Sequence, residues 1–120
     1  MKNNKKIKIH IKNNHWAPGS FPSDAEGEKN FTITKEHLDK ALKMFPEIKE
    51  KVEIFIDWDE DNFKNSMSNS DILLAWNFST KNLKKIAPNL KWVHLISAGV
   101  EHLFPLDWMF DGLVLTNSSG

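Results

Sequence analysis

The sequence contains neither cysteine nor arginine. Without cysteine, the chain can form no disulfide, use no thiolate nucleophile and build no zinc site from cysteine ligands. Without arginine, it lacks the planar guanidinium group that binds a carboxylate or phosphate through two parallel hydrogen bonds. Any anion site in this protein must therefore use lysine or backbone N–H groups.

Long apolar runs and an excess of one charge are also missing. No apolar stretch approaches the roughly 20 residues that a membrane span needs, and Met1 to Lys12 lacks the continuous apolar core of a signal peptide. The 16 basic and 16 acidic residues cancel, so no overall field favours nucleic acid or an anionic membrane. We therefore expect a cytoplasmic protein that binds neither of them.

Nucleotide and metal motifs are absent as well. The sequence has no Gly-x-Gly-x-x-Gly and no Walker loop, so this chain has no recognisable dinucleotide or triphosphate site of its own. Asp57-x-Asp59-x-Asp61 begins like a calcium loop. Asn62 and Ser68 stand where that loop needs glycine and glutamate, so we predict a solvated acidic turn. The histidines show no metal-ligand spacing, and we expect no metal site.

The most informative stretch runs from Asp71 to Gly99. Two short apolar runs, Ile72 to Trp76 and Leu90 to Ile96, are typical of parallel strands that are covered on both faces. Between them lies a short basic helix, for which Ser79 or Thr80 is the expected N-cap and Pro88 the stop signal. Such short connections imply a right-handed parallel crossover, so both strands end at the same edge of one sheet.

The rest of the chain repeats this alternation of strand and helix. The other predicted elements are a strand at Lys6 to Lys12, a helix from Thr34 to about Pro46 with a further turn at Glu47 to Lys51, a strand from Val52, a short helix within Asp59 to Met67 that carries Phe63 and Met67 inward, short turns at Val100 to Leu103 and Pro105 to Phe110, and a last strand at Leu113 to Leu115. A long polar loop, Asn13 to Thr34, follows the first strand. The pattern predicts one α/β domain over residues 1–120, a flavodoxin-like doubly wound parallel sheet of about five strands with helices on both faces.

The first strand does not fit this fold easily. Isoleucines alternate with Lys8, His10 and Lys12, which predicts a strand with one wet face. In the flavodoxin-like order 2-1-3-4-5, however, the first strand is central. Either that face meets something outside this chain or the strand order differs.

Open α/β sheets bind ligands at the carboxyl ends of their strands. The loops expected there are Asn13 to Trp16, Trp76 to Phe78 and Ser97 to Val100. Gly99 allows close approach of the backbone, and the turn that follows presents N–H groups to an anion. The alternative is that Ser97 to Gly99 only ends a strand, and that Trp76 and Phe78 belong to the core.

Three ordered blocks of the sequence resemble a known family. These blocks are Ser70-Asp-Ile-Leu-Leu, Ile86-Ala-Pro-Asn-Leu-Lys-Trp-Val-His-Leu-Ile-Ser-Ala-Gly-Val-Glu, and Leu113-Val-Leu-Thr-Asn-Ser-Ser-Gly. They are similar to the amino-terminal, substrate-side domain of the D-isomer-specific 2-hydroxyacid dehydrogenases. The resemblance covers the second half of the chain well, and the first half only in the order of strands and helices. Glu101 stands where the family more often has aspartate.

The resemblance implies a set of substrate-binding residues. Ser97, Ala98, Gly99 and Val100 match the loop whose backbone N–H groups hold the substrate carboxylate. The resemblance also assigns Trp76 and Asn77 to the neighbouring loop, which shapes the pocket around the substrate side chain. No catalytic, cofactor-binding or metal-binding residue is expected within residues 1–120.

The resemblance also implies what the parent protein does. It would exchange hydride between NAD or NADP and a 2-oxoacid or D-2-hydroxyacid, as a homodimer, with the cofactor and the catalytic groups on a Rossmann domain expected after residue 120. The 120-residue chain alone would then bind no cofactor and have no activity. The alternative from another class is a non-enzymatic, flavodoxin-like interaction or signalling module, although neither an acidic phosphate-accepting cluster nor an FMN phosphate loop follows the first strand.

Overall fold

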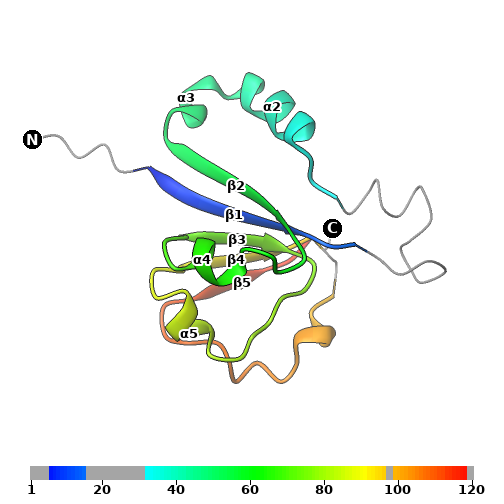
Figure 1. The fold of residues 1–120 in the computed structure, drawn as a ribbon, viewed down its shortest axis with the longest axis vertical. Coiled ribbons are helices and arrows are strands. Elements are labelled where there is room, and N and C mark those ends of the chain that lie inside the picture. Colours follow the sequence, from blue (N-terminus) through cyan, green and yellow to red (C-terminus); the bar gives the residue numbers. More distant parts are fainter. Residues whose placement is uncertain (1–5, 16–31, 97–98, 119–120) are drawn as a thin grey trace, which may run out of the picture.

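The chain folds around a single parallel sheet (Figure 1). The computed structural model describes residues 6–15, 32–96 and 99–118. Its strands are β1 (Ile7–Asn13), β2 (Val52–Trp58), β3 (Ile72–Ala75), β4 (Trp92–Leu95) and β5 (Val114–Thr116). All neighbouring strands are parallel, in the order β2-β1-β3-β4-β5. The predicted five-stranded flavodoxin-like α/β fold is confirmed, with β1 inside the sheet.

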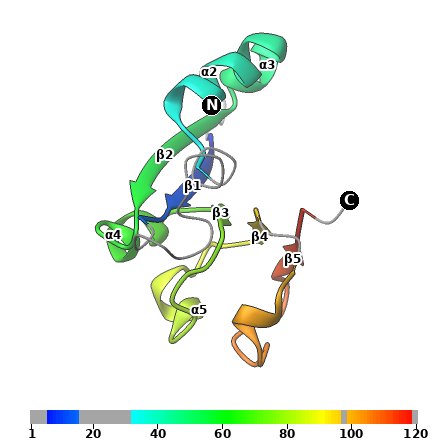
Figure 2. The ribbon, with the colours of Figure 1, turned by 90° about the vertical axis from the view of Figure 1, so that its right-hand side faces the viewer.

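Short helices connect the strands on both sides of the sheet. They are α2 (Lys35–Met44), α3 (Pro46–Lys49), α4 (Phe63–Met67), α5 (Leu83–Ile86) and the 3-10 turn η1 (Glu101–Leu103). Figure 2 shows α4, α5 and the region of η1 on one side, and α2 with α3 on the other, near β2. None of the helices in the described ranges has the length and apolar character needed to cross a membrane.

Local capping chemistry sets the start of α2, whereas a contact between distant residues sets the start of α5. The predicted helix start at Thr34 agrees with the structure, where Thr34 is the N-cap of α2 and its side-chain oxygen accepts a hydrogen bond from the N–H of His37. The predicted cap of α5 is wrong, because Asn82 occupies that position with a left-handed backbone at φ 59°. Ser79 instead bonds to Glu60, so its hydroxyl serves the cavity described below.

The apolar core lies on the side of the sheet covered by α4 and α5. Its members are buried side chains of β3, β4 and the surrounding helices and loops: Phe63, Met67, Leu73, Ala75, Phe78, Leu83, Ala87, Leu90, Val93, Leu95, Leu103 and Leu113. The predicted inward positions of Phe63 and Met67 are confirmed, with 2% and 0% of their surface exposed. In contrast, α2 has no fully buried residue, and Phe45, which follows it, is 51% exposed.

The prediction of a wet face on β1 is wrong, and the order of the sheet explains why. His10 and Lys12 are 0% and 5% exposed, whereas Ile7 on the other side of the strand is 46% exposed. β1 pairs with β2 and β3 along its two edges, and α4 packs against it, with Ser66 of that helix in contact with His10. Polar groups in such a position need polar partners, and both side chains have them.

Candidate functional site

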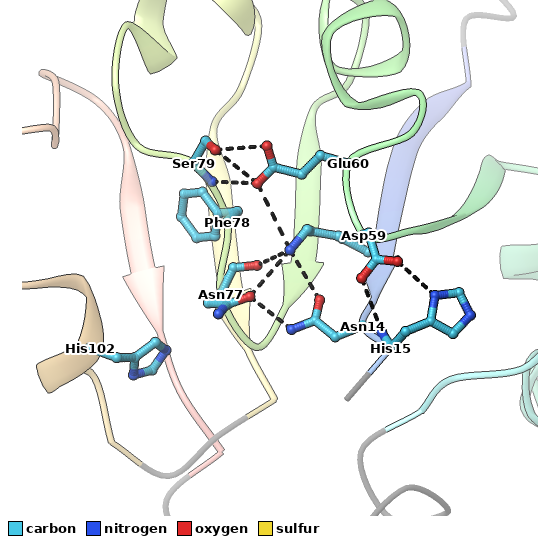
Figure 3. A pocket seen from close by; sticks show the side chains of 9 residues that line it. Asn14, His15, Asp59, Glu60, Asn77, Phe78, Ser79 and His102 are labelled. Atoms are coloured by element: carbon cyan, nitrogen blue, oxygen red, sulfur yellow. Dashed lines mark hydrogen bonds and ion pairs between the residues drawn. The ribbon is translucent and has the colours of Figure 1, made fainter. Parts of the chain in front are cut away.

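The ends of four strands surround an open cavity of about 620 Å³ (Figure 3). Nine residues line it: Lys12, Asn14, His15, Asp59, Glu60, Asn77, Phe78, Ser79 and His102. They follow or end β1, β2 and β3, or belong to η1 after β4. Since all four strands are parallel, these residues mark the carboxyl edge of the sheet, where open α/β sheets place their ligands.

Lys12 forms the cationic floor of this cavity. Its Nζ donates hydrogen bonds to Asn14 Oδ1 at 3.0 Å, Asn77 O at 2.8 Å and Asn77 Oδ1 at 3.2 Å. Glu60 Oε2 lies 3.9 Å from the same nitrogen. Asn14 Nδ2 also donates to Asn77 Oδ1, at 2.8 Å. Because Asn77 Oδ1 accepts two hydrogen bonds, the orientation of its amide is fixed and its NH₂ group is left to meet a ligand.

Burial lowers the pKa of Lys12 from its usual value, because an ammonium group loses hydration at 5% exposure. The carboxylates of Glu60, Asp59 and Asp57 oppose this effect and favour the charged form. The oxygens around Nζ act in the same direction as the carboxylates. The outcome is a positive charge at the base of the cavity that is held in place by fixed dipoles.

Glu60 and Ser79 connect the ends of β2 and β3. Glu60 accepts hydrogen bonds from the backbone N–H of Ser79 at 2.8 Å and from its hydroxyl at 2.7 and 2.9 Å. Both oxygens of the carboxylate are therefore engaged. This connection holds the loop that carries Asn77 against the loop that follows β2.

His15 and Asp59 form a second polar pair at the rim. The backbone N–H of His15 donates to Asp59 Oδ1 at 3.0 Å, and its Nδ1 lies 2.6 Å from Oδ2. These bonds hold the pKa of Asp59 below its usual value. Asp59 has a positive φ of 54°, and the His15 ring stacks on Trp58 with centroids 4.6 Å apart. Figure 3 shows this pair on the side of the cavity opposite His102.

His102 brings the loop after β4 to the cavity. Its Nε2 lies 2.6 Å from the carbonyl oxygen of Trp76. A carbonyl only accepts, so Nε2 carries the hydrogen and Nδ1 is the other polar atom of the ring. The imidazole therefore joins the Trp76–Asn77 loop to η1.

Comparisons with protein-family models, curated proteins and solved structures found no match. The functional assignment of this chain therefore rests on its own residues. The combination at this edge is a buried ammonium, a donating amide, an imidazole and the carboxylates of Asp59 and Glu60. The ammonium and the amide can orient an anionic group that lies away from the two carboxylates.

The structure places the six residues expected from sequence in different surroundings. Asn77 lines the cavity, and the half-buried Trp76 lies beside it, with its ring centroid 6.2 Å from that of His102. Val100 packs against the core cluster. Gly99 is half-buried outside the cavity lining, and Ser97 and Ala98 lie outside the described residues.

Gly99 was expected to allow close approach of the backbone to a ligand, but a side chain of the protein occupies the space beside it. The space that a Cβ would take is occupied by the carboxylate of Glu101, the end of a flexible side chain. A larger residue at position 99 therefore has to displace Glu101 and not the backbone. The acidic group itself stands next to the loop that was expected to receive a carboxylate.

Sequence reasoning placed the right loops at this edge but missed most of the residues that form the cavity. Asn14 and His15 lie in the first of the three predicted loops, and Asn77 and Phe78 lie in the second. Lys12 was missed because its alternation with isoleucine suggested solvent. Asp59 and Glu60 follow β2, and the only available signal was that their strand ends at the same edge.

Proposed function

We propose that this chain is the substrate-side domain of an NAD(P)-dependent D-2-hydroxyacid dehydrogenase, and that its carboxyl-edge cavity holds the carboxylate end of a 2-oxoacid or 2-hydroxyacid. The observation that carries the proposal is the meeting of Lys12, Asn77 and His102 in one cavity. Lys12 supplies positive potential, and the Asn77 NH₂ group supplies a directed donor. The resemblance in the second half of the chain supports the same substrate class.

The electrostatics of the cavity favour one side of it for the carboxylate. Asp59 and Glu60 lie on the side opposite His102 in Figure 3. A carboxylate placed beside the Asn77 NH₂ group avoids both acids and keeps Lys12 nearby. The opposite side then meets the remainder of the substrate.

The proposal divides the chemistry between two domains. Hydride exchange belongs to a bound nicotinamide and to an acid/base group. In this proposal a Rossmann domain supplies both, the parent protein is a cytoplasmic homodimer, and this chain binds the substrate. Alone, residues 1–120 should neither bind NADH saturably nor oxidise it when a 2-oxoacid is added.

A titration of the ¹⁵N-labelled chain with pyruvate, the simplest 2-oxoacid, tests the binding role. We expect saturable amide shifts at Asn77 and His102 with a Kd of about 1 mM, which corresponds to about −4 kcal/mol. Asn77→Ala should weaken binding several-fold, whereas Asn89→Ala, an exposed asparagine outside the cavity, should leave it unchanged. Equal binding by both variants, or shifts confined to another surface, would refute the proposal.

An interaction module is the second candidate, and one observation favours it. On the side of the sheet opposite the core, Ile72, Trp92 and Val114 form a row across β3, β4 and β5. Trp92 and Val114 are 39% and 53% exposed, and contiguous apolar exposure is typical of protein-binding surfaces. An interaction module should self-associate through this row, and Val114→Lys should abolish that self-association in sedimentation. The same variant should leave the pyruvate titration unchanged, because Val114 lies outside the cavity.

A further inference from the structure

A second group of reactive residues lies under α4, away from the carboxyl-edge cavity. Ser66 on α4 places its Oγ 2.6 Å from Nδ1 of His10 on β1. On the other side of the imidazole, Nε2 lies 3.6 Å from Oδ2 of Asp57 on β2. A serine, a histidine and an aspartate are thus arranged in the order that activates a serine nucleophile, with the two ring nitrogens exchanged relative to the usual triad.

The surroundings of His10 determine which nitrogen carries the hydrogen. The ring is fully buried, and its Nε2 has no hydrogen-bond partner within the described part of the chain. The carboxylate of Asp57 is the polar group that faces this nitrogen. A hydrogen on Nε2 is attracted to that carboxylate, whereas a lone pair there would be repelled. Nδ1 is then the acceptor, and the Ser66 hydroxyl donates to it.

Burial keeps this imidazole neutral. Desolvation is the largest influence on the pKa of His10 and lowers it, with Lys12 acting in the same direction and Asp57 against both. A neutral Nδ1 can accept the serine proton. The distance of 3.6 Å to Asp57 is long for a hydrogen bond, as it often is in catalytic groups without a ligand.

Asp57 is held in position by the turn before α4. Its Oδ2 accepts from the backbone N–H of Asn62 at 3.1 Å, and its Oδ1 accepts from Asn62 Nδ2 at 3.2 Å. The carboxylate is 3% exposed, so water does not compete for it. These two bonds fix the carboxylate next to the His10 ring.

Ser66 faces a cavity of about 350 Å³ that has room for a small ligand. Phe55, 43% exposed, supplies an apolar wall. Asn62, which precedes α4, and Asn69, which follows it, line the same cavity as Ser66. Because Asn62 Nδ2 donates to Asp57, the NH₂ group of Asn69 is the candidate to stabilise the oxyanion of an acyl-transfer intermediate.

We propose that Ser66 is an activated nucleophile that accepts the acyl group of a small ester, with His10 as its general base and Asp57 as a positioning residue. Ser66 Oγ attacks the ester carbonyl carbon, and its proton passes to His10 Nδ1. The bond to the alcohol oxygen breaks, and the alcohol leaves with that proton. Water then attacks the acyl-serine by the same route, which releases the carboxylic acid and restores Ser66.

A fluorophosphonate probe and p-nitrophenyl acetate test this proposal on the whole chain. Mass spectrometry of the intact protein and of its peptides should show one phosphonyl group, located on Ser66. p-Nitrophenyl acetate should give a burst of one nitrophenolate per chain. Ser66→Ala should abolish both signals, whereas Ser68→Ala, which removes an exposed hydroxyl on the same turn, should change neither.

Variants of His10 and Asp57 and the pH dependence of labelling test the roles of these two residues. His10→Gln should slow labelling at least about 100-fold, as expected for the loss of a general base. If His10→Gln does not fold, Asp57→Asn and the pH profile decide. Labelling of the parent should fall at acid pH as His10 binds a proton, and Asp57→Asn should shift that profile. No labelling, labelling of another side chain, or a pH-independent rate would overturn the proposal.

Discussion

Replacement of Lys12 by methionine should destabilise the domain in a way that a matched variant does not. Methionine keeps the length of the aliphatic stem but donates no hydrogen bond. The oxygens of Asn14 and Asn77 therefore lose a charged donor, and a hydrogen bond to a charged group contributes about 1.5–3 kcal/mol. Removal of a poorly solvated charge returns part of that cost, so we expect a net loss of about 2 kcal/mol.

This loss is large enough to measure by thermal unfolding. An unfolding entropy of about 2.1 cal/mol/K per residue gives about 0.25 kcal/mol/K for 120 residues, so 2 kcal/mol lowers Tm by about 8 °C. Lys8→Met is the control, because Lys8 lies on the same side of the same strand and its ammonium bonds to no residue in the described ranges. Circular dichroism of both variants gives the comparison.

The pH dependence gives an independent check. Because the pKa of Lys12 is lowered in the folded state, the folded protein releases this proton while the unfolded chain still holds it. Between that lowered value and about 10.5, the parent should gain stability as pH rises, and Lys12→Met should not. If Lys12→Met is no less stable than Lys8→Met and the gap does not change with pH, Lys12 does not organise the cavity.

Three further outcomes are expected. Because the pKa of His10 is lowered in the folded state, the unfolded chain gains a proton below about pH 6.5 before the folded chain does. The free energy of unfolding in urea should therefore fall at acid pH by at most about 1.4 kcal/mol per pH unit. His10→Gln should flatten this slope, whereas His37→Gln should not. Trp76→Ala should change the relative affinities for pyruvate and phenylpyruvate by more than it lowers Tm; the reverse would assign Trp76 to the core. Gly99→Val should displace the Glu101 side chain and lower the free energy of unfolding by less than about 1 kcal/mol. It should also weaken pyruvate binding several-fold in the same titration. Unchanged binding would show that this loop does not belong to the site.

The arrangement of the sheet could be predicted because its signals are local. The apolar runs around Ile72 and Val93 are too short for helices, and their short connection leaves a right-handed crossover as the main solution. The helix start at Thr34 was predictable for the same reason, since an N-cap depends on neighbours within a few residues. Elements and their order therefore follow from short-range patterns.

Burial of polar side chains could not be predicted in this way. His10 and Lys12 read as solvent-exposed because alternation with isoleucine is the usual sign of a half-buried strand. Their partners, Ser66 and Asn77, lie more than 50 residues further along the chain. No local pattern reveals such pairs, and only the position of β1 between β2 and β3 brings them together.

The cap of α5 shows the same limit on a smaller scale. Ser79 has the chemistry of an N-cap, and local rules favour that role. Glu60, at the end of another strand, offers a carboxylate to both its hydroxyl and its N–H. This tertiary contact determines where the hydroxyl points, and the helix begins at Leu83 instead.

The charge requirement of the carboxyl-edge cavity is the most direct test of the proposed function. ¹⁵N-labelled chain should be titrated in parallel with pyruvate and with methyl pyruvate, which keeps the ketone but has no carboxylate. Saturable shifts at Asn77 and His102 with pyruvate, and at least a tenfold weaker response to methyl pyruvate, are the predicted result. Equal responses to the two compounds, or none at these residues, would contradict the assignment of this cavity as a 2-oxoacid site.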